Sequence, residues 1–428
     1  MKHGAAQSAD PWGVSAVLAL GFWGICLIRL GIPSTPYFDE VHYLPAAREL
    51  LEFGAFTNRE HPLFGKILIA AGIGIFGDNP WGWRIMPTLA GAGMVYGLMR
   101  AAWHATRSRF AALAYGVLVA TGVLIFVHAR VAMLDIFCMA FLSLALWQGA
   151  AAIRKPEQGR WRLALCGIAL GLAMASKWNA AIIAPLFGLG FLAMRMSAGR
   201  RRLLLSRRGA PVPGITLLEA ALWLGAVPLA VYAATFWPAY HFAIDSIGST
   251  TGASGLIAHH ADMARMQSSV VQPHPYQSEW WQWAANLRGI WYLYEPVDGA
   301  QRGILLIGNP VSMLLGLAAM VWAAARGIVT RDGLLLVLVF LYVWTLGFWA
   351  VADKPVQFYY HYLLPSLFLH GALALALDGF WQAGRKWLAL LPLAASVAAF
   401  IWLFPILTAA ELDGEMAFLD WALLEGWR

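Results

Sequence analysis

Long apolar runs recur from one end of this chain to the other, and they constrain the fold more than any other feature. A helix needs about 20 mostly apolar residues to cross the hydrocarbon core of a bilayer. Because backbone polar groups must be satisfied internally in lipid, only helices and closed barrels span a membrane. Only 12% of the residues are charged, against about 25% in soluble domains. The chain is therefore predicted to be an all-α polytopic membrane protein.

About eleven segments are candidates for transmembrane helices. The second segment is too long for one helix, so we expect a re-entrant or surface piece over 67–76 and a true span over 84–99. The expected segments are 13–31, 67–99, 110–127, 133–152, 163–177, 179–195, 216–237, 303–325, 333–352, 358–377 and 387–408.

The distribution of charge predicts the orientation. With the N-terminus in the cytoplasm, most Lys and Arg residues lie in cytoplasmic segments and most Asp and Glu residues lie outside, as the positive-inside rule requires. Arg200–Arg202 is the strongest single anchor. We therefore expect an integral protein of the cell (inner) membrane, with its active site and C-terminus on the periplasmic or extracellular side. The net charge of +7 needs no nucleic-acid partner.

Two segments on the expected outer side exceed the length of a turn, within what we take to be a single integral membrane domain, 1–428. The first, 32–66, is expected to hold an amphipathic helix on the membrane surface. The second, 239–302, is expected to be a long loop. The helical spacing of the first segment is carried by Val41, Leu44, Ala47 and Leu51.

The adjacent acids Asp39 and Glu40 follow the first apolar segment. Ionisable groups at a membrane are costly and are candidates for function. If the backbone is extended here, the two side chains point to opposite sides, so one acid can serve as a general base while the scaffold holds the other. The alternative is a capping pair at the start of the surface helix. Both roles are compatible.

Several cationic residues come from separate segments on the same expected outer face. Positive charge gathered there suits a phosphate in a lipid headgroup. The simpler alternatives are basic side chains that only snorkel to the interface, and a local ion pair between Arg130 and Asp135. The candidates for binding the donor phosphate or sugar are His61, Lys66, Arg84, Arg130, Asp135, Lys177 and His361.

The aromatic residues of the outer segments allow two interpretations. Tyr359–Tyr362 opens the tenth segment, and Trp280, Trp281 and Trp283 lie in the second long segment. They are either belt residues at the interface or platforms for sugar rings. His259 and His260 lack a third ligand at metal spacing, so we expect a solvated loop there.

These motifs, in this order, resemble the protein O-mannosyltransferases, and the resemblance covers nearly the whole chain. One acid pair alone would be weak, because many enzymes that use lipid-linked sugars carry one. The ordered set is far more specific. The matching stretches are Phe38–His42, His61–Lys66, Trp83–Pro87, Arg130–Asp135, Ser176–Trp178, His274–Ser278, Gly308–Pro310 and Tyr360–Pro365.

The resemblance implies a GT-C glycosyltransferase fold with eleven spans and a polyprenyl- or dolichyl-phosphate mannose donor. It implies transfer of mannose, with inversion, to Ser or Thr of a secretory protein outside the cytoplasm. Asp39 matches the acid beside the acceptor hydroxyl, and Glu40 matches the second acid. Contacts to the acceptor or its loop are assigned to His274, Tyr276, Ser278 and Trp280.

Two departures from the family pattern stand out. Leu63 replaces the usual second proline, and the interval between the seventh and eighth segments has no room for the MIR domain of eukaryotic members. The chain therefore resembles the bacterial type. The expected scheme requires no metal and no further cofactor, and a dimer is left open.

Two other functions remain open at the level of sequence. One is a GT-C enzyme that moves a sugar from a polyprenyl phosphate to a lipid or glycan. The other is a transporter of lipid-linked sugars, which we rank lower because no paired halves are evident.

Overall fold

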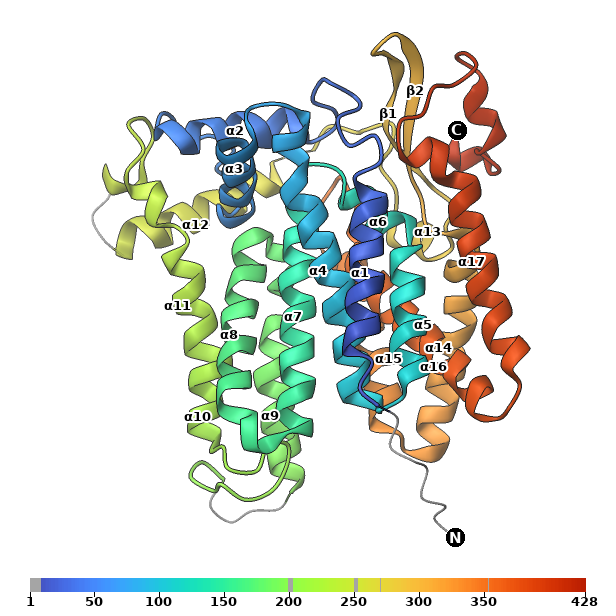
Figure 1. The fold of residues 1–428 in the computed structure, drawn as a ribbon. Coiled ribbons are helices and arrows are strands. Elements are labelled where there is room, and N and C mark those ends of the chain that lie inside the picture. Colours follow the sequence, from blue (N-terminus) through green and yellow to red (C-terminus); the bar gives the residue numbers. More distant parts are fainter. Residues whose placement is uncertain (1–8, 199–202, 250–252, 270, 353) are drawn as a thin grey trace.

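The computed structural model describes residues 9–198, 203–249, 253–269, 271–352 and 354–428, so the anchor Arg200–Arg202 lies outside the described residues. Long helices run side by side through the molecule, and short helices and a hairpin cover one end (Figure 1). The long bundle consists of α1 (Trp12–Cys26), α4 (Pro80–Thr106), α5 (Arg109–Ala120), α7 (Leu134–Arg154), α8 (Gly159–Ser176), α9 (Ala184–Ser197), α10 (Leu217–Ala221), α11 (Val227–Ala234), α14 (Pro310–Thr330), α15 (Gly333–Val351), α16 (Leu363–Gln382) and α17 (Lys386–Leu407). The remaining elements are α2 (Glu40–Glu52), α3 (Phe64–Phe76), α6 (Val123–His128), α12 (Ala253–Ser268), α13 (Trp280–Ala284), β1 (Ile290–Val297) and β2 (Ala300–Leu306).

The prediction of a mostly helical membrane protein is confirmed. Within the described ranges, seven helices are long and apolar enough to cross a membrane, by length and composition. Helices α1, α3 and α5 are shorter apolar helices. Each of the expected segments overlaps a helix of the structure, and the full number of spans stays a prediction.

The long second segment divides as expected, into α3 and α4. Asn79 ends the break between them, because its side-chain oxygen accepts hydrogen bonds from the amides of Trp81 and Gly82 and Pro80 begins the helix. Helix α4 then packs against α7 along much of its length. A Cβ atom at Gly97 would lie 2.7 Å from Ser143 Oγ, so the small residue allows the close approach.

The expected surface helix forms as α2, which lies across the end of the bundle (Figure 1). Leu44 and Ala47 are fully buried, whereas Val41 and Leu51 are about half exposed. The predicted apolar stripe therefore splits, with its centre packed on the bundle and its edges left on the outside. Figure 1 places α2 and the C-terminal segment at the end of the bundle opposite the start of α1.

The second long segment is more ordered than expected. It contains α12, α13 and most of an antiparallel hairpin in which Ile290 pairs with Leu306. Asp298 and Gly299 form the two-residue turn with positive φ angles of 49° and 77°, as in a type I′ hairpin. Residues 303–306 belong to β2, so the predicted span over 303–325 began too early.

The C-terminal segment is joined to this hairpin. The amide of Leu412 donates to Gln301 O, and Trp291 Nε1 donates to Trp427 O. Trp427 Nε1 in turn donates to the carbonyl of Asn286. Residues after α17 therefore form part of the layer of short helices and hairpin that covers this end of the bundle.

Asn309 connects three parts of the bundle. Its side-chain oxygen accepts from the amides of Val311 and Ser312, which caps α14, and its Nδ2 donates to the carbonyls of Thr121 and Ser396. The residue is 1% exposed, so all these polar atoms are shielded from water.

We expect Asn309→Ala to lower the free energy of unfolding by about 3 kcal/mol, because it removes a helix cap and leaves two buried carbonyls without a donor. The unfolding temperature of the purified protein in detergent checks this. Asp332→Ala removes a cap at an exposed helix start and should cost only about 1 kcal/mol. Equal losses in the two variants would contradict the bridging role of Asn309.

Candidate active site

Glu40 and Arg84 form a buried, bidentate ion pair. Arg84 Nε and Nη2 each lie 2.8 Å from a different oxygen of Glu40, and the side chains are 0% and 1% exposed. The amides of Ala132 and Tyr37 also donate to Glu40, at 3.0 and 3.3 Å. Glu40 is thus a fully bonded carboxylate that joins α2, α4 and the turn before α7.

The rest of the Arg84 guanidinium holds the chain between α1 and α2. Nη1 donates to the carbonyls of Leu30 and Pro33, and Nη2 donates to the carbonyl of Thr35. All five N–H groups of this guanidinium therefore have acceptors. We expected Arg84 to bind the donor phosphate. The structure instead directs all of these donors at Glu40 and at backbone carbonyls.

Asp39 differs from its neighbour in every respect. Its backbone is helical, with φ −68° and ψ −9°, so the extended geometry we expected is wrong. Although it stands at the start of α2, its side chain caps no backbone amide. Within the described parts of the chain, its carboxylate has no hydrogen bond or ion pair. Asp39 therefore does not act as a capping residue through its side chain.

The backbone just before Asp39 is strained. Phe38 has a φ of 50°, a left-handed conformation that is costly for a bulky residue. Its ring stacks on Tyr292 of β1, with centroids 3.7 Å apart. The hairpin thus supports the conformation that presents Asp39.

The electrostatic surroundings hold a proton on Asp39 longer than usual. Burial raises the pKa of Asp39 to about 6, and the carboxylate of Asp135 adds to this, while Lys177 is the largest opposing influence. His42 and Lys354 also lower it. A carboxyl group with a pKa near 6 can exchange protons at physiological pH.

Asp135 and Lys177 form a second buried ion pair. Lys177 Nζ lies 2.8 and 2.6 Å from the two oxygens of Asp135. The same Nζ lies 5.1 Å from the centroid of the Tyr360 ring. The alternative of a local pair between Arg130 and Asp135 is wrong, because Asp135 pairs with Lys177 from the end of α8.

Two other predicted cations are also used by the scaffold. Arg130 donates to the carbonyls of Cys26, Ile28 and Arg29, which satisfies the C-terminal end of α1. Lys66 is fully buried and donates to the carbonyls of Asn58 and His61. Neither side chain points a free donor at Asp39.

The two predicted histidines lie in different surroundings. His61 packs edge-on to Tyr43, with centroids 5.8 Å apart, and its buried Nδ1 has no partner in the described structure. His361 is 2% exposed and stacks on Trp349 at 3.8 Å. Both of its ring nitrogens are also without partners among the described residues. Burial holds the pKa of His61 well below its usual value.

The predicted acceptor contacts spread over one loop. His274 is exposed, Tyr276 is half-buried and Trp280 is 37% exposed. Ser278 is buried, where its hydroxyl accepts from Trp283 Nε1 and its amide donates to Gln357 O. This last bond joins the loop to the connection between α15 and α16.

That connection carries a residue that the sequence reasoning missed. Lys354 is half-buried, and burial followed by the charge of Lys177 lowers its pKa to about 8. Asp135 and Asp39 act in the opposite direction. The available signal was Lys354-Pro355 at the expected outer end of the ninth segment, just before the tyrosine-rich stretch.

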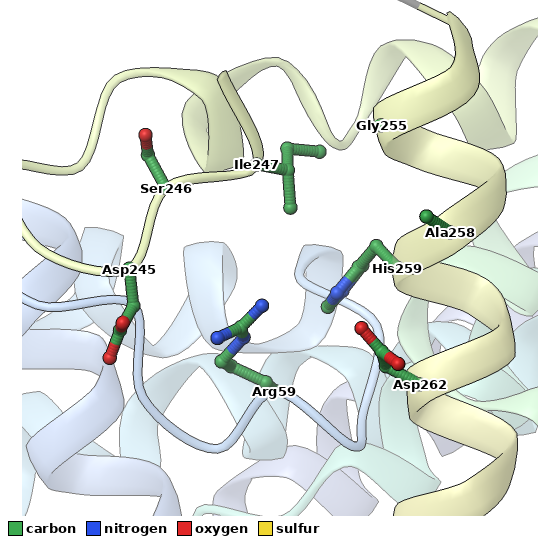
Figure 2. A pocket seen from close by; sticks show the side chains of 8 residues that line it. All are labelled: Arg59, Asp245, Ser246, Ile247, Gly255, Ala258, His259 and Asp262. Atoms are coloured by element: carbon green, nitrogen blue, oxygen red, sulfur yellow. The ribbon is translucent and has the colours of Figure 1, made fainter. Parts of the chain in front are cut away.

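A cavity of about 140 Å³ lies away from this cluster, between α12 and the segment 245–247 (Figure 2). Figure 2 shows His259 and Arg59 pointing toward one another across it. His259 is 2% exposed and lies on a helix, and His260 bonds Tyr232, so the expected solvated loop is wrong. In the part of the chain that the structure describes, no group of three His, Cys, Asp or Glu side chains could hold a metal ion.

Comparison with known families identifies the fold and the motifs. Residues 75–244 match the model of dolichyl-phosphate-mannose–protein mannosyltransferases. Residues 253–427 match the model of the C-terminal four-helix membrane region of protein O-mannosyltransferases. The chain belongs to the protein O-mannosyltransferase family.

Curated relatives of this O-mannosyltransferase family member agree along nearly their whole length. A polyprenol-phosphate-mannose–protein mannosyltransferase of Mycobacterium tuberculosis is 29% identical, over 92% of this chain and 87% of the relative. The protein of the same name from Mycolicibacterium smegmatis is 28% identical, over 96% and 92%.

Two solved structures resemble the O-mannosyltransferase fold described above. The protein O-mannosyltransferase Pmt1-Pmt2 complex of S. cerevisiae, bound to the sugar donor, gives a TM-score of 0.80 at 15% identity, over 98% of this chain and 93% of that chain. ArnT from Cupriavidus metallidurans, bound to undecaprenyl phosphate, gives 0.61 at 15% identity, over 94% and 77%. These likenesses establish the GT-C fold.

Breaking the pair between Glu40 and Arg84 should be strongly destabilising, because it leaves a buried charge without its partner. We expect Arg84→Gln or Glu40→Gln alone to lower the free energy of unfolding by about 3 kcal/mol or more. The double substitution should lose less than the sum of the two. Thermal unfolding of the four proteins measures this coupling, and strictly additive losses would contradict it.

Proposed function

We propose that this protein transfers mannose from polyprenyl-phosphate mannose to the hydroxyl of Ser or Thr in a secreted or membrane protein. The single observation that carries the proposal is the half-buried carboxylate of Asp39, which has no partner among the described residues, beside the fully bonded Glu40. The family of the chain and the names of its curated relatives support the choice of sugar donor and acceptor.

In the proposed reaction, Asp39 is the general base. A Ser or Thr hydroxyl is a weak nucleophile, so a positioned base must take its proton during attack. The hydroxyl oxygen bonds to the anomeric carbon, and the bond from that carbon to the phosphate oxygen breaks. The bonding electrons leave with the phosphate, and the proton passes to Asp39. A single displacement of this kind inverts the configuration of the sugar.

Glu40 and Arg84 have a positioning role in this scheme. Their ion pair fixes the first turn of α2 and the chain before it, so Asp39 keeps one position relative to the incoming hydroxyl. Arg130 and Lys66 support neighbouring turns. We assign Lys177, Asp135, His61 and His361 to the donor side of the site.

The acceptor is proposed to approach along the loop that carries His274, Tyr276, Ser278 and Trp280. The positive-inside pattern supports an orientation with the site on the outer face and the N-terminus in the cytoplasm. Dimerisation remains a prediction, and the proposed scheme needs no metal or other cofactor.

The deciding experiment is mannosyl transfer by the purified protein in nanodiscs, with radiolabelled polyprenyl-phosphate mannose and a Ser/Thr-rich peptide. Transfer to the peptide would support the proposal. Transfer only to a glycolipid would favour the alternative GT-C enzyme. Movement of the labelled donor across the bilayer without transfer would favour a transporter.

Asp39→Asn should lower the transfer rate by about 100-fold or more, because a general base contributes about 10²–10⁴. In the wild type the rate should rise as the pH passes about 6, where Asp39 loses its proton. The groups that face Asp39 and set this value are Lys177 from α8, Asp135 from α7, His42 from α2 and Lys354 from the connection after α15.

The stability of the same variant provides the control. The folded state raises the pKa of Asp39 from its ordinary value of 3.8 to about 6, so folding favours the protonated form and the ionised carboxylate destabilises the protein above pH 6. Asp39→Asn should therefore keep or raise the unfolding temperature at pH 7. A large drop in unfolding temperature would attribute the lost activity to misfolding instead.

A further inference from the structure

Four cationic side chains were predicted to bind the donor phosphate, and in the described structure each of them already has acceptors of its own. Lys177 is neutralised by both oxygens of Asp135, and Arg84 is neutralised by both oxygens of Glu40. The donors of Lys66 and Arg130 are directed at backbone carbonyls. A phosphate that departs with extra negative charge needs a cation that is not already matched.

Lys354 meets this requirement. In the described ranges its ammonium group donates no hydrogen bond and forms no ion pair. Lys354 lines the same cavity as Trp349, whose ring stacks on His361 with centroids 3.8 Å apart. Its charge also lowers the pKa of Asp39, so it lies among the predicted site residues. The connection that carries Lys354 continues to Tyr360. The ring of Tyr360 lies 5.1 Å from Lys177 Nζ. It also lies 6.2 Å from the ring of Phe38, the residue before Asp39.

We propose that Lys354 binds the phosphate of the lipid-linked sugar, and that the polar cavity beside it holds the hexosyl group. This inference rests on the proposed function, since it assigns the two parts of the donor to places in the same site.

The cavity has the size and lining that a sugar requires. Its volume is about 390 Å³, which lies within the usual range of about 300–1,000 Å³ for ligand sites. Two tryptophans offer faces for a sugar ring, and three glutamines offer amide groups for its hydroxyls. The residues that line it include Gln277, Trp280, Gln282, Trp349, Lys354 and Gln357.

The glutamines keep part of their bonding capacity. The side-chain oxygens of Gln277 and Gln282 accept from the amides of His274 and Glu279. Their amide nitrogens donate no hydrogen bond within the described residues. In Gln357 the side-chain nitrogen is the bonded atom, because it donates to the carbonyls of Trp349 and Lys354. Its side-chain oxygen accepts no hydrogen bond within the described residues. Sugar hydroxyls can donate and accept, so they can use both kinds of group.

The walls of this cavity are held in place from outside it. Ser278 N donates to Gln357 O, which fixes the acceptor loop to the connection that carries Lys354. Trp349 is held by its stack on His361. Lys354 is thus a flexible side chain on a fixed rim, which allows it to follow the phosphate as the bond to the sugar breaks.

The first test measures binding of polyprenyl phosphate without sugar to the full-length protein in detergent. Lys354→Gln should weaken binding by about 10- to 100-fold, as expected for a lost charge-assisted hydrogen bond, and Lys354→Arg should retain most of it. Lys386→Gln removes the same charge from the exposed start of α17 and should bind as the wild type does. Equal binding by Lys354→Gln and the wild type would overturn the role of Lys354.

The second test separates the sugar from the phosphate. Gln282→Leu should weaken binding of polyprenyl-phosphate mannose several-fold, while its affinity for polyprenyl phosphate alone stays unchanged, which also shows that the variant is folded. Loss of affinity for both ligands in equal measure, or for neither, would overturn the placement of the hexosyl group.

These outcomes are distinguishable from a failure of the proposed function. Wild-type protein that transfers mannose to no peptide, but whose binding of polyprenyl phosphate depends on Lys354, would refute the acceptor and retain the phosphate site. Wild-type protein that mannosylates the peptide, with a Lys354→Gln variant of unchanged KM for the donor, would retain the function and refute the inference.

Discussion

The buried pair of Glu40 and Arg84 is the interaction on which the rest of the site depends. It is placed at the meeting point of α2, α4 and the turn before α7, and its remaining donors fix the chain from Leu30 to Thr35. A charge pair in this position is costly to desolvate. Its geometry compensates, because every donor and acceptor is matched. The neighbouring Asp39 is thereby held in one place without being bonded itself.

The charged residues of the proposed site fall into two groups: those that are bonded within the fold and those that have no partner among the described residues. Four cationic side chains donate to carboxylates or backbone carbonyls and so fix the segments that they contact: Arg84, Arg130, Lys66 and Lys177. Two ionisable groups of the proposed site form no ion pair or hydrogen bond within the described residues: the carboxylate of Asp39 and the ammonium of Lys354. A single displacement at a sugar phosphate needs one group to accept a proton and one to stabilise the departing charge. These two free groups have the corresponding chemistry.

The sequence predicted the architecture well where the signal was local and repeated. The apolar runs gave the helices, and the spacing in 40–53 gave α2, because periodic patterns report burial directly. The hairpin was missed although Asp298-Gly299 is a strong turn signal, because we gave the apolar residues after it to a span. Candidate site residues could be named from their type and order along the chain, and their assignment to the site stays a prediction. Their roles could not be named, because nothing in a sequence tells whether an arginine already has acceptors for all its donors.

The hydrogen bonds that join the segment after α17 to the hairpin have a consequence for how the protein is made. Trp427 bonds Asn286, and Asn286 in turn holds Gly308 and Tyr359, which leads to the tyrosine-rich wall of the site. This segment follows α17 in the chain, so ribosomes complete it after the described helices of the bundle. During synthesis the helices of the bundle can therefore insert before this end of the molecule is complete, and the contacts that link Trp427 through Asn286 to the tyrosine-rich wall form only after translation has passed α17.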